Sequence, residues 1–216
     1  MDPAFNMAYD EALLEAMPRV QRPVLRLYAW TEPAATFGYF QHYAEVELLT
    51  GLRPLIRRPT AGGIVPHEAD WTYSLAFPTT HEWYALSARD SYRRLHCWVK
   101  EAFAELNQAT ELAPEPFKPT LGQCFVGHEE ADLLWRGRKI AGAAQRRRKD
   151  GLLIQGSIQP PLSTMSRLDW EKAMLESARR MFGIEWHLQA DEPLIQQRAL
   201  ELREAKYSRP DYNRRR

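Results

Sequence analysis

Apolar and polar residues follow two different periods along the chain, which predict a mixture of helices and strands. Helical spacing begins after Asp2, which can cap a helix starting at Pro3, and we expect this helix to end at Pro18. Residues 24–30 alternate in character and predict a strand, with Leu25, Leu27 and Ala29 on one side and Arg26, Tyr28 and Trp30 on the other. Residues 33–38 predict a turn and residues 42–49 a short helix. The apolar face of the first helix consists of Phe5, Ala8, Ala12, Leu13 and Ala16.

The rest of the chain continues this mixed pattern. Gly137 and the pair Asp150-Gly151 predict tight turns, and Gly183 predicts the end of a helix. Because helices and strands do not alternate regularly, the pattern favours an α+β fold with a mixed, largely antiparallel sheet flanked by helices. The predicted strands are residues 52–57, 71–77, 132–135, 138–144 and 152–158, and the predicted helices are residues 87–107, 168–182 and 192–206.

Composition and charge exclude several classes of protein. Hydrophobic residues make up 44% of the 216 residues, as in a packed globular protein, and the net charge of +1 argues against a broad nucleic-acid surface. Cys97 and Cys124 have no partners at metal-ligand spacing, so we expect no metal site. No apolar run reaches membrane-spanning length and no signal peptide is evident, so we expect a cytoplasmic protein that does not bind membranes.

Two short segments place small residues beside fixed positive charge. The first is RRPTAGGIVPH, in which Gly62 and Gly63 let the backbone approach a ligand and Arg57 and Arg58 can bind a phosphate or carboxylate. The second is GRKIAGAAQRR, in which Lys139 precedes small residues that leave room for a ligand. Together the segments predict a pocket for an activated acyl group or an acyl phosphate.

These segments belong to a longer series of motifs by which the chain resembles the catalytic domain of the lipoate-protein ligase A family. That family includes related octanoyltransferases and is more distantly similar to biotin ligases. The motifs are PAFNMAYDEALLEA (3–16), LRLYAWTEPAATFGYFQ (25–41), RRPTAGGIVPHEADWTYSL (57–75), CFVGHEEADLLWRGRKIAGAAQRR (124–147), LLIQGSI (152–158) and KYSRPDYN (206–213).

The resemblance implies a single biotin/lipoate ligase-like catalytic domain over residues 1–216, without a C-terminal accessory domain. Its implied activity is attachment of lipoate or octanoate to a lysine of a lipoyl carrier domain, in a dehydrogenase E2 subunit or the glycine cleavage H protein. Lys139 would lie at the reacting carbonyl, where a cation stabilises the oxyanion. The residues implied to bind the acyl group or its adenylate are Arg57, Arg58, Thr60, Ala61, Gly62, Gly63, His67, Gly142 and Ala143.

Three hypotheses about function stay open at this point. The first is a ligase that uses ATP and magnesium to form an acyl-adenylate, with or without a small accessory subunit. The second is an octanoyltransferase that takes octanoate from acyl carrier protein through a thioester on Cys124, which could equally be a small buried apolar residue. The third is a non-catalytic module that binds lipoate or its carrier, since Ala61 replaces a glycine that is common in the family and the accessory domain is missing. Gln155 also stands where many members of the family carry histidine, so a proton-transfer role there is lost.

Overall fold

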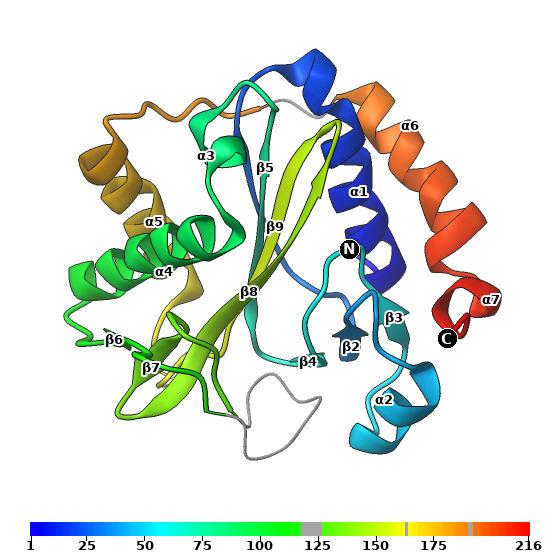
Figure 1. Cartoon of the computed structure of the whole chain (residues 1–216), viewed down its shortest axis with the longest axis horizontal. Helices are drawn as coiled ribbons and strands as arrows, with labels where there is room; N and C mark the ends of the chain where they lie inside the picture. The colour runs from blue at the N-terminus through cyan, green and yellow to red at the C-terminus, as the bar shows by residue number, and fades with distance from the viewer. Residues whose placement is uncertain (118–126, 163, 190–191) are drawn as a thin grey trace.

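The computed structural model describes residues 1–117, 127–162, 164–189 and 192–216, which build two β-sheets (Figure 1). The larger sheet has six strands in the order β1-β5-β9-β8-β7-β6, and all neighbouring strands are antiparallel. These strands are β1 (Val24–Tyr28), β5 (Trp71–Phe77), β6 (Glu111–Leu112), β7 (Leu133–Trp135), β8 (Arg138–Arg148) and β9 (Gly151–Ile158).

The smaller sheet has three strands in the order β3-β2-β4. Strand β2 (Ala34–Phe37) runs parallel to β3 (Leu55–Arg57) and antiparallel to β4 (Val65–His67). This pairing brings the segment that follows β1 together with both ends of the glycine-containing loop.

Helices cover both faces of the larger sheet, as the sequence pattern predicts for an α+β fold. Figure 1 shows α4 and α5 on one side of the sheet and α1 and α6 on the other. The helices are α1 (Pro3–Val20), α2 (Tyr43–Leu49), α3 (Glu82–Ala85), α4 (Ala88–Glu105), α5 (Arg167–Phe182), α6 (Pro193–Leu202) and α7 (Pro210–Asn213), with a π-helical turn at Arg203–Tyr207. No helix in the described ranges is long and apolar enough to cross a bilayer.

The central strands carry a core on each face. Every residue of β5 and β9 is buried, because successive side chains point to opposite faces and both faces are covered. Tyr73 and Leu75 pack toward α4 and α5, and Ala76 packs with Leu13 and Met17 of α1. The middle of the larger sheet is therefore a rigid support for the residues at the ends of its strands.

Helix α1 begins as predicted but does not end at Pro18. The Asp2 carboxylate accepts a hydrogen bond from the Phe5 N–H at 3.0 Å, and Pro3 occupies the first turn. The helix continues to Val20 and ends where Gln21 adopts a φ of 56° and donates its N–H to the Met17 carbonyl. Pro18 lies in the last turn of α1, so little of the helix follows it that a proline could disrupt.

The smaller sheet is the main feature that the pattern of apolar residues does not predict. Residues 34–37 form β2 rather than a turn, and β4 at Val65–His67 was not predicted at all. All four residues of β2 are buried, so they show no alternation between apolar and polar, and Pro33 beside them is typical of a turn.

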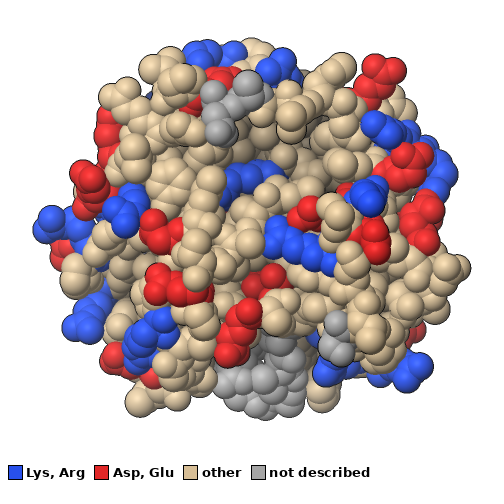
Figure 2. Space-filling model, turned by 180° about the vertical axis from the view of Figure 1, so that it is seen from behind, with Lys and Arg blue, Asp and Glu red and all other residues tan. Residues whose placement is uncertain are grey.

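Strand β8 is longer than predicted and includes the basic run at its end. It extends to Arg148 instead of residue 144, because its backbone stays paired with β9 up to the pair Arg148–Gly151. Arg146 donates to the Pro59 carbonyl at 2.7 Å, and Arg148 lies 3.3 Å from the Glu11 carboxylate. The run is therefore part of the fold. Figure 2 shows positive and negative side chains interspersed on the face opposite to that of Figure 1, in keeping with the small net charge.

Candidate active site

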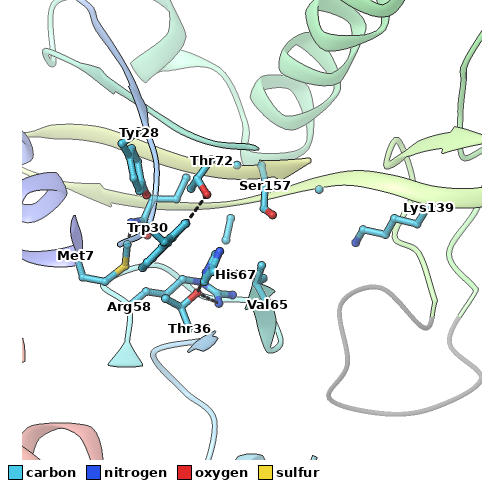
Figure 3. Close-up of a pocket in the computed structure, with 16 residues that line it drawn as sticks. Met7, Tyr28, Trp30, Thr36, Arg58, Val65, His67, Thr72, Lys139 and Ser157 are labelled. Carbon is cyan, nitrogen blue, oxygen red and sulfur yellow. Dashed lines mark hydrogen bonds between the residues drawn. The ribbon is translucent and has the colours of Figure 1, made fainter. Parts of the chain in front are cut away.

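A narrow cavity of about 50 Å³ lies where the two sheets meet (Figure 3). Its wall combines residues of α1, β1, the smaller sheet, the glycine loop and the middle of the larger sheet. The lining residues are Met7, Tyr28, Trp30, Thr36, Arg58, Gly62, Val65, His67, Thr72, Lys139, Gly142, Ala143, Ala144, Gln155, Gly156 and Ser157. Figure 3 shows Lys139 reaching in from one side, far from the group formed by Trp30, Arg58 and His67.

Arg58 closes the glycine loop over this cavity. Its guanidinium donates hydrogen bonds to the carbonyls of Ala61 at 2.6 Å and Gly63 at 2.7 Å. Gly62 between them has a φ of 89°, and a Cβ there would lie only 2.8 Å from the Arg58 guanidinium. The backbone conformation therefore favours glycine at position 62, and a larger residue would also require the Arg58 guanidinium to move.

Arg57, next to Arg58, has a different environment. Its side chain is fully buried and donates to the carbonyls of Tyr39, Gln41 and Asn213, at 2.7–3.0 Å. It does not line the cavity. Arg57 thus joins the loop after β2 to α7, and of the two sequence-predicted arginines only Arg58 faces the cavity.

The other residues of the predicted loop are arranged around the cavity rather than all facing it. Thr60, Ala61 and Gly63 do not line it. The Thr60 hydroxyl donates to the Gln155 side-chain carbonyl at 2.7 Å, while the Ala61 and Gly63 carbonyls accept from Arg58. These backbone and side-chain polar groups of the loop therefore form hydrogen bonds within the protein.

His67 lies in the cavity wall with both ring nitrogens engaged. Nδ1 is 2.8 Å from the Asp70 carboxylate, Nε2 is 2.8 Å from the Thr36 hydroxyl, and the ring stacks on Trp30 with 3.8 Å between centroids. A carboxylate only accepts, so Nδ1 carries a proton toward Asp70. Asp70 also accepts from Thr72, and this network holds the ring in a single orientation.

Lys139 is the buried cation at the other end of the cavity. Its side chain is 7% exposed, and its Nζ lies 2.7 Å from a carboxylate oxygen of Asp132. A Cβ on Gly142 would lie 2.7 Å from the Lys139 Cε and 2.8 Å from its Nζ, so the ammonium occupies the space that the glycine leaves. Gly142 and Ala143 line the cavity beside it.

Lys139 also lines a second, wider cavity of about 300 Å³ on its outer side. The wall of this cavity includes Phe117, Gly127, His128, Arg136, Gly137 and Arg138. Lys139 therefore borders both a smaller inner cavity and a larger outer one. A group bound in the inner cavity and a group arriving through the outer cavity would meet at Lys139.

A buried carboxylate of α1, which the sequence pattern does not mark as functional, supports the inner cavity. Asp10 is fully buried and accepts hydrogen bonds from Arg26, Tyr28, Ser74 and Gln155, at 2.7–3.1 Å. Burial and the Asp10 charge raise the pKa of Tyr28 well above its usual value.

Cys124, the predicted nucleophile, lies outside the described residues. Cys97, the other cysteine, lies in α4 and forms no disulfide. In the described ranges, no group of three or more His, Cys, Asp or Glu side chains could hold a metal ion.

The chain belongs to the lipoyl protein ligase A/B catalytic domain family, whose model matches residues 2–175. Curated relatives include octanoyltransferase LipM of Oceanobacillus iheyensis, 38% identical over 168 residues, and octanoyltransferase LipM of Staphylococcus aureus, 35% identical over 170 residues. These alignments cover 75% and 73% of this chain, and 61% and 62% of the relatives' own length.

Solved structures of the same fold are lipoate-protein ligases. A lipoate-protein ligase A bound with ATP aligns with a TM-score of 0.79 and 19% identity, covering 99% of this chain and 94% of that one. The bi-partite lipoate protein ligase of Thermoplasma acidophilum aligns with a TM-score of 0.73 and 19% identity, covering 98% of this chain and 91% of that one. At this identity the likeness shows the fold, which is the one expected from the sequence motifs.

Proposed function

We propose that the protein is an octanoyltransferase. It moves an octanoyl group from the thioester of acyl carrier protein to the lysine amine of a lipoyl carrier domain, in a dehydrogenase E2 subunit or the glycine cleavage H protein. The observation that supports this most directly is that Lys139 lines both the inner and the outer cavity. Relatives named octanoyltransferase LipM favour this second sequence hypothesis over the acyl-adenylate ligase.

The inner cavity would hold the acyl chain with its carbonyl toward Lys139. When a nucleophile attacks that carbonyl, negative charge develops on its oxygen, and a positioned cation stabilises that charge. Lys139 is suited to this because its ammonium is buried and fixed by Asp132. Arg58, His67 and Gly62 would shape the other end of the cavity without contacting the reacting carbon.

Two steps complete the proposed reaction. The thiolate of Cys124 attacks the donor thioester, forms an acyl-enzyme thioester and releases the thiol of the acyl carrier protein. The lysine amine of the lipoyl domain then attacks the acyl-enzyme, forms the amide and releases the Cys124 thiol. No ATP or magnesium is consumed, because the donor is already activated.

Intact mass measurement of both proteins tests this proposal. The protein is incubated with octanoyl acyl carrier protein and a lipoyl domain, and in parallel with lipoate, ATP and magnesium. We expect the first mixture to add one octanoyl group to the lipoyl domain, and to add it transiently to the enzyme. Cys124→Ala should abolish both additions, whereas the matched variant Cys97→Ala should retain them.

Each of the other outcomes contradicts the proposal in a recognisable way. Labelling only in the mixture with ATP, unchanged in Cys124→Ala, would support the acyl-adenylate ligase. Retained binding of octanoate or lipoate without transfer to any lipoyl domain would support a non-catalytic module. In that case Ala61 and Gln155 would be the first positions to revert to the residues common in the family.

A further inference from the structure

Tyr92 of α4 contacts the same carboxylate as Lys139, that of Asp132. Its hydroxyl donates a hydrogen bond to Oδ1 of Asp132, while Oδ2 of the same carboxylate lies 2.7 Å from the Lys139 Nζ. The Glu129 N–H also donates to Oδ2, at 2.6 Å. Both oxygens of this fully buried carboxylate are thus held by donors, which a buried charge requires.

The same hydroxyl also holds the strand that lines the reactive end of the cavity. Strand β7 pairs with β8 only as far as Ala141, opposite Leu133. Two residues further along this edge, the Ala143 N–H donates to the Tyr92 hydroxyl at 3.3 Å. A side chain of helix α4 therefore accepts the hydrogen bond from an edge N–H of β8 at a point where β7 no longer pairs with it.

Through these two contacts Tyr92 reaches both Asp132 and the strand segment next to Gly142, which lie beside the Lys139 ammonium. Asp132 fixes the ammonium from one side, and Gly142, next to Ala143, provides the space that it fills. Without the hydroxyl, Oδ1 of Asp132 would lose this donor and the Ala143 N–H would lose its acceptor. Both the carboxylate and the strand could then shift relative to the ammonium.

We propose that Tyr92 is a positioning residue for acyl transfer: its hydroxyl holds Asp132 and the strand at Ala143, and through them it fixes the Lys139 ammonium. This proposal rests on the proposed function, because it takes Lys139 as the group that stabilises the oxyanion. Tyr92 acts through Asp132 and does not contact the substrate. Its removal should therefore slow transfer without weakening binding of the acyl donor.

Tyr92→Phe removes only the hydroxyl and is the variant to test. A small displacement of a catalytic group can cost up to about 100-fold, so we expect kcat for octanoyl transfer to fall roughly 10- to 30-fold. The KM for octanoyl acyl carrier protein should change less than about twofold, since binding common to ground and transition states is kept. Tyr84→Phe is the matched control, because its hydroxyl donates to the Arg148 carbonyl, away from Asp132.

A double-mutant cycle separates positioning from a general loss of structure. If Tyr92 acts through Lys139, then Tyr92→Phe should lower the remaining single-turnover rate of Lys139→Ala by less than about twofold. Equal losses in both backgrounds, or a Tyr92→Phe enzyme with unchanged kcat, would overturn the proposal. If Lys139→Ala gives no measurable rate, Asp132→Asn takes its place in the cycle.

Crystal structures of the wild type and Tyr92→Phe give a measurement that does not depend on activity. We expect the Lys139 ammonium in the variant to leave its place beside Gly142 or to separate from Asp132. An ammonium in the same place would overturn the proposal. A wild-type protein that transfers octanoate from no donor would instead contradict the proposed function, and the two structures would still decide the role of Tyr92.

Discussion

The two ends of the inner cavity hold positive charge in opposite ways. At the loop end, the Arg58 guanidinium donates to the carbonyls of Ala61 and Gly63, so its hydrogen bonds shape the protein backbone. At the other end, the Lys139 ammonium pairs with Asp132 and borders two cavities. A cation in a sequence motif can thus build the site or face the reaction, and only its partners distinguish the two.

Among the variants that test this comparison, we expect the largest loss of activity when the Lys139 ammonium is removed. Lys139→Ala should lower kcat for octanoyl transfer roughly 100- to 1000-fold, because the oxyanion would lose its cation. The measurement is the rate of octanoyl addition to a lipoyl domain by mass. Lys100→Ala on α4 is the matched control and should transfer at the wild-type rate. A loss of less than about tenfold in Lys139→Ala would place the reaction elsewhere.

The second expected effect concerns the acid stability of the Lys139 end. His96 is fully buried behind Tyr92, and burial lowers its pKa to about 4. When the pH falls below the ordinary histidine pKa of about 6.5, His96 binds a proton in the unfolded chain but stays neutral in the folded protein. The free energy of unfolding therefore decreases between about pH 6.5 and about pH 4. The loss from this group should be on the order of 3 kcal/mol.

Urea unfolding at several pH values measures that loss. The variant His96→Leu should remove most of this part of the pH dependence, whereas His42→Leu, at an exposed position, should leave it unchanged. Identical pH dependence in the wild type and His96→Leu would mean that His96 is not kept neutral by the fold.

A third prediction tests the Lys139 end of the cavity by filling the space beside the ammonium. Gly142→Ala would place a Cβ 2.8 Å from the Lys139 Nζ, so the ammonium must move. We expect kcat to fall roughly tenfold or more, because displaced catalytic groups lose transition-state stabilisation. Steady-state kinetics with octanoyl acyl carrier protein checks this. Gly51→Ala is the control, since a Cβ there meets nothing within 4 Å.

The smallest expected effect lies at the loop end. Gly62→Ala combines an unfavourable φ of 89° with a Cβ 2.8 Å from the Arg58 guanidinium, a flexible group that can move. The free energy of unfolding should fall by about 1–2 kcal/mol, the usual cost of such a backbone conformation. The KM should rise more than kcat falls, measured by the same kinetics. A larger effect on kcat than Gly142→Ala produces would reverse the proposed roles of the two ends.

Much of the larger sheet and its helices could be predicted from periodicity, but the smaller sheet could not. Strands β1 and β9 and helix α4 are long enough to show their pattern, and Asp150-Gly151 marks the β8–β9 hairpin. Strands β2 and β4 have only four and three residues, which is too short to show a period, and Pro33 before β2 is typical of a turn.

The candidate site, like the fold, could be predicted from the sequence only in part. Motifs indicated Lys139 and the glycine loop, because small residues beside fixed charge are visible in the sequence. They could not tell Arg57 from Arg58, since adjacent residues face different ways and only the fold decides which one faces the cavity. Asp10 and Tyr92 gain their roles from strands and helices that are distant in sequence, so no local pattern marks them.

Asp10 joins the first helix to the three adjoining strands β1, β5 and β9 through one carboxylate. Because every acceptor position of that carboxylate is used inside the protein, none of these elements can separate from the others without stranding a buried charge. Amide hydrogens on the three strands should therefore exchange with solvent together, at the rate of global unfolding. The inner wall of the cavity is thus expected to keep its shape from one reaction cycle to the next.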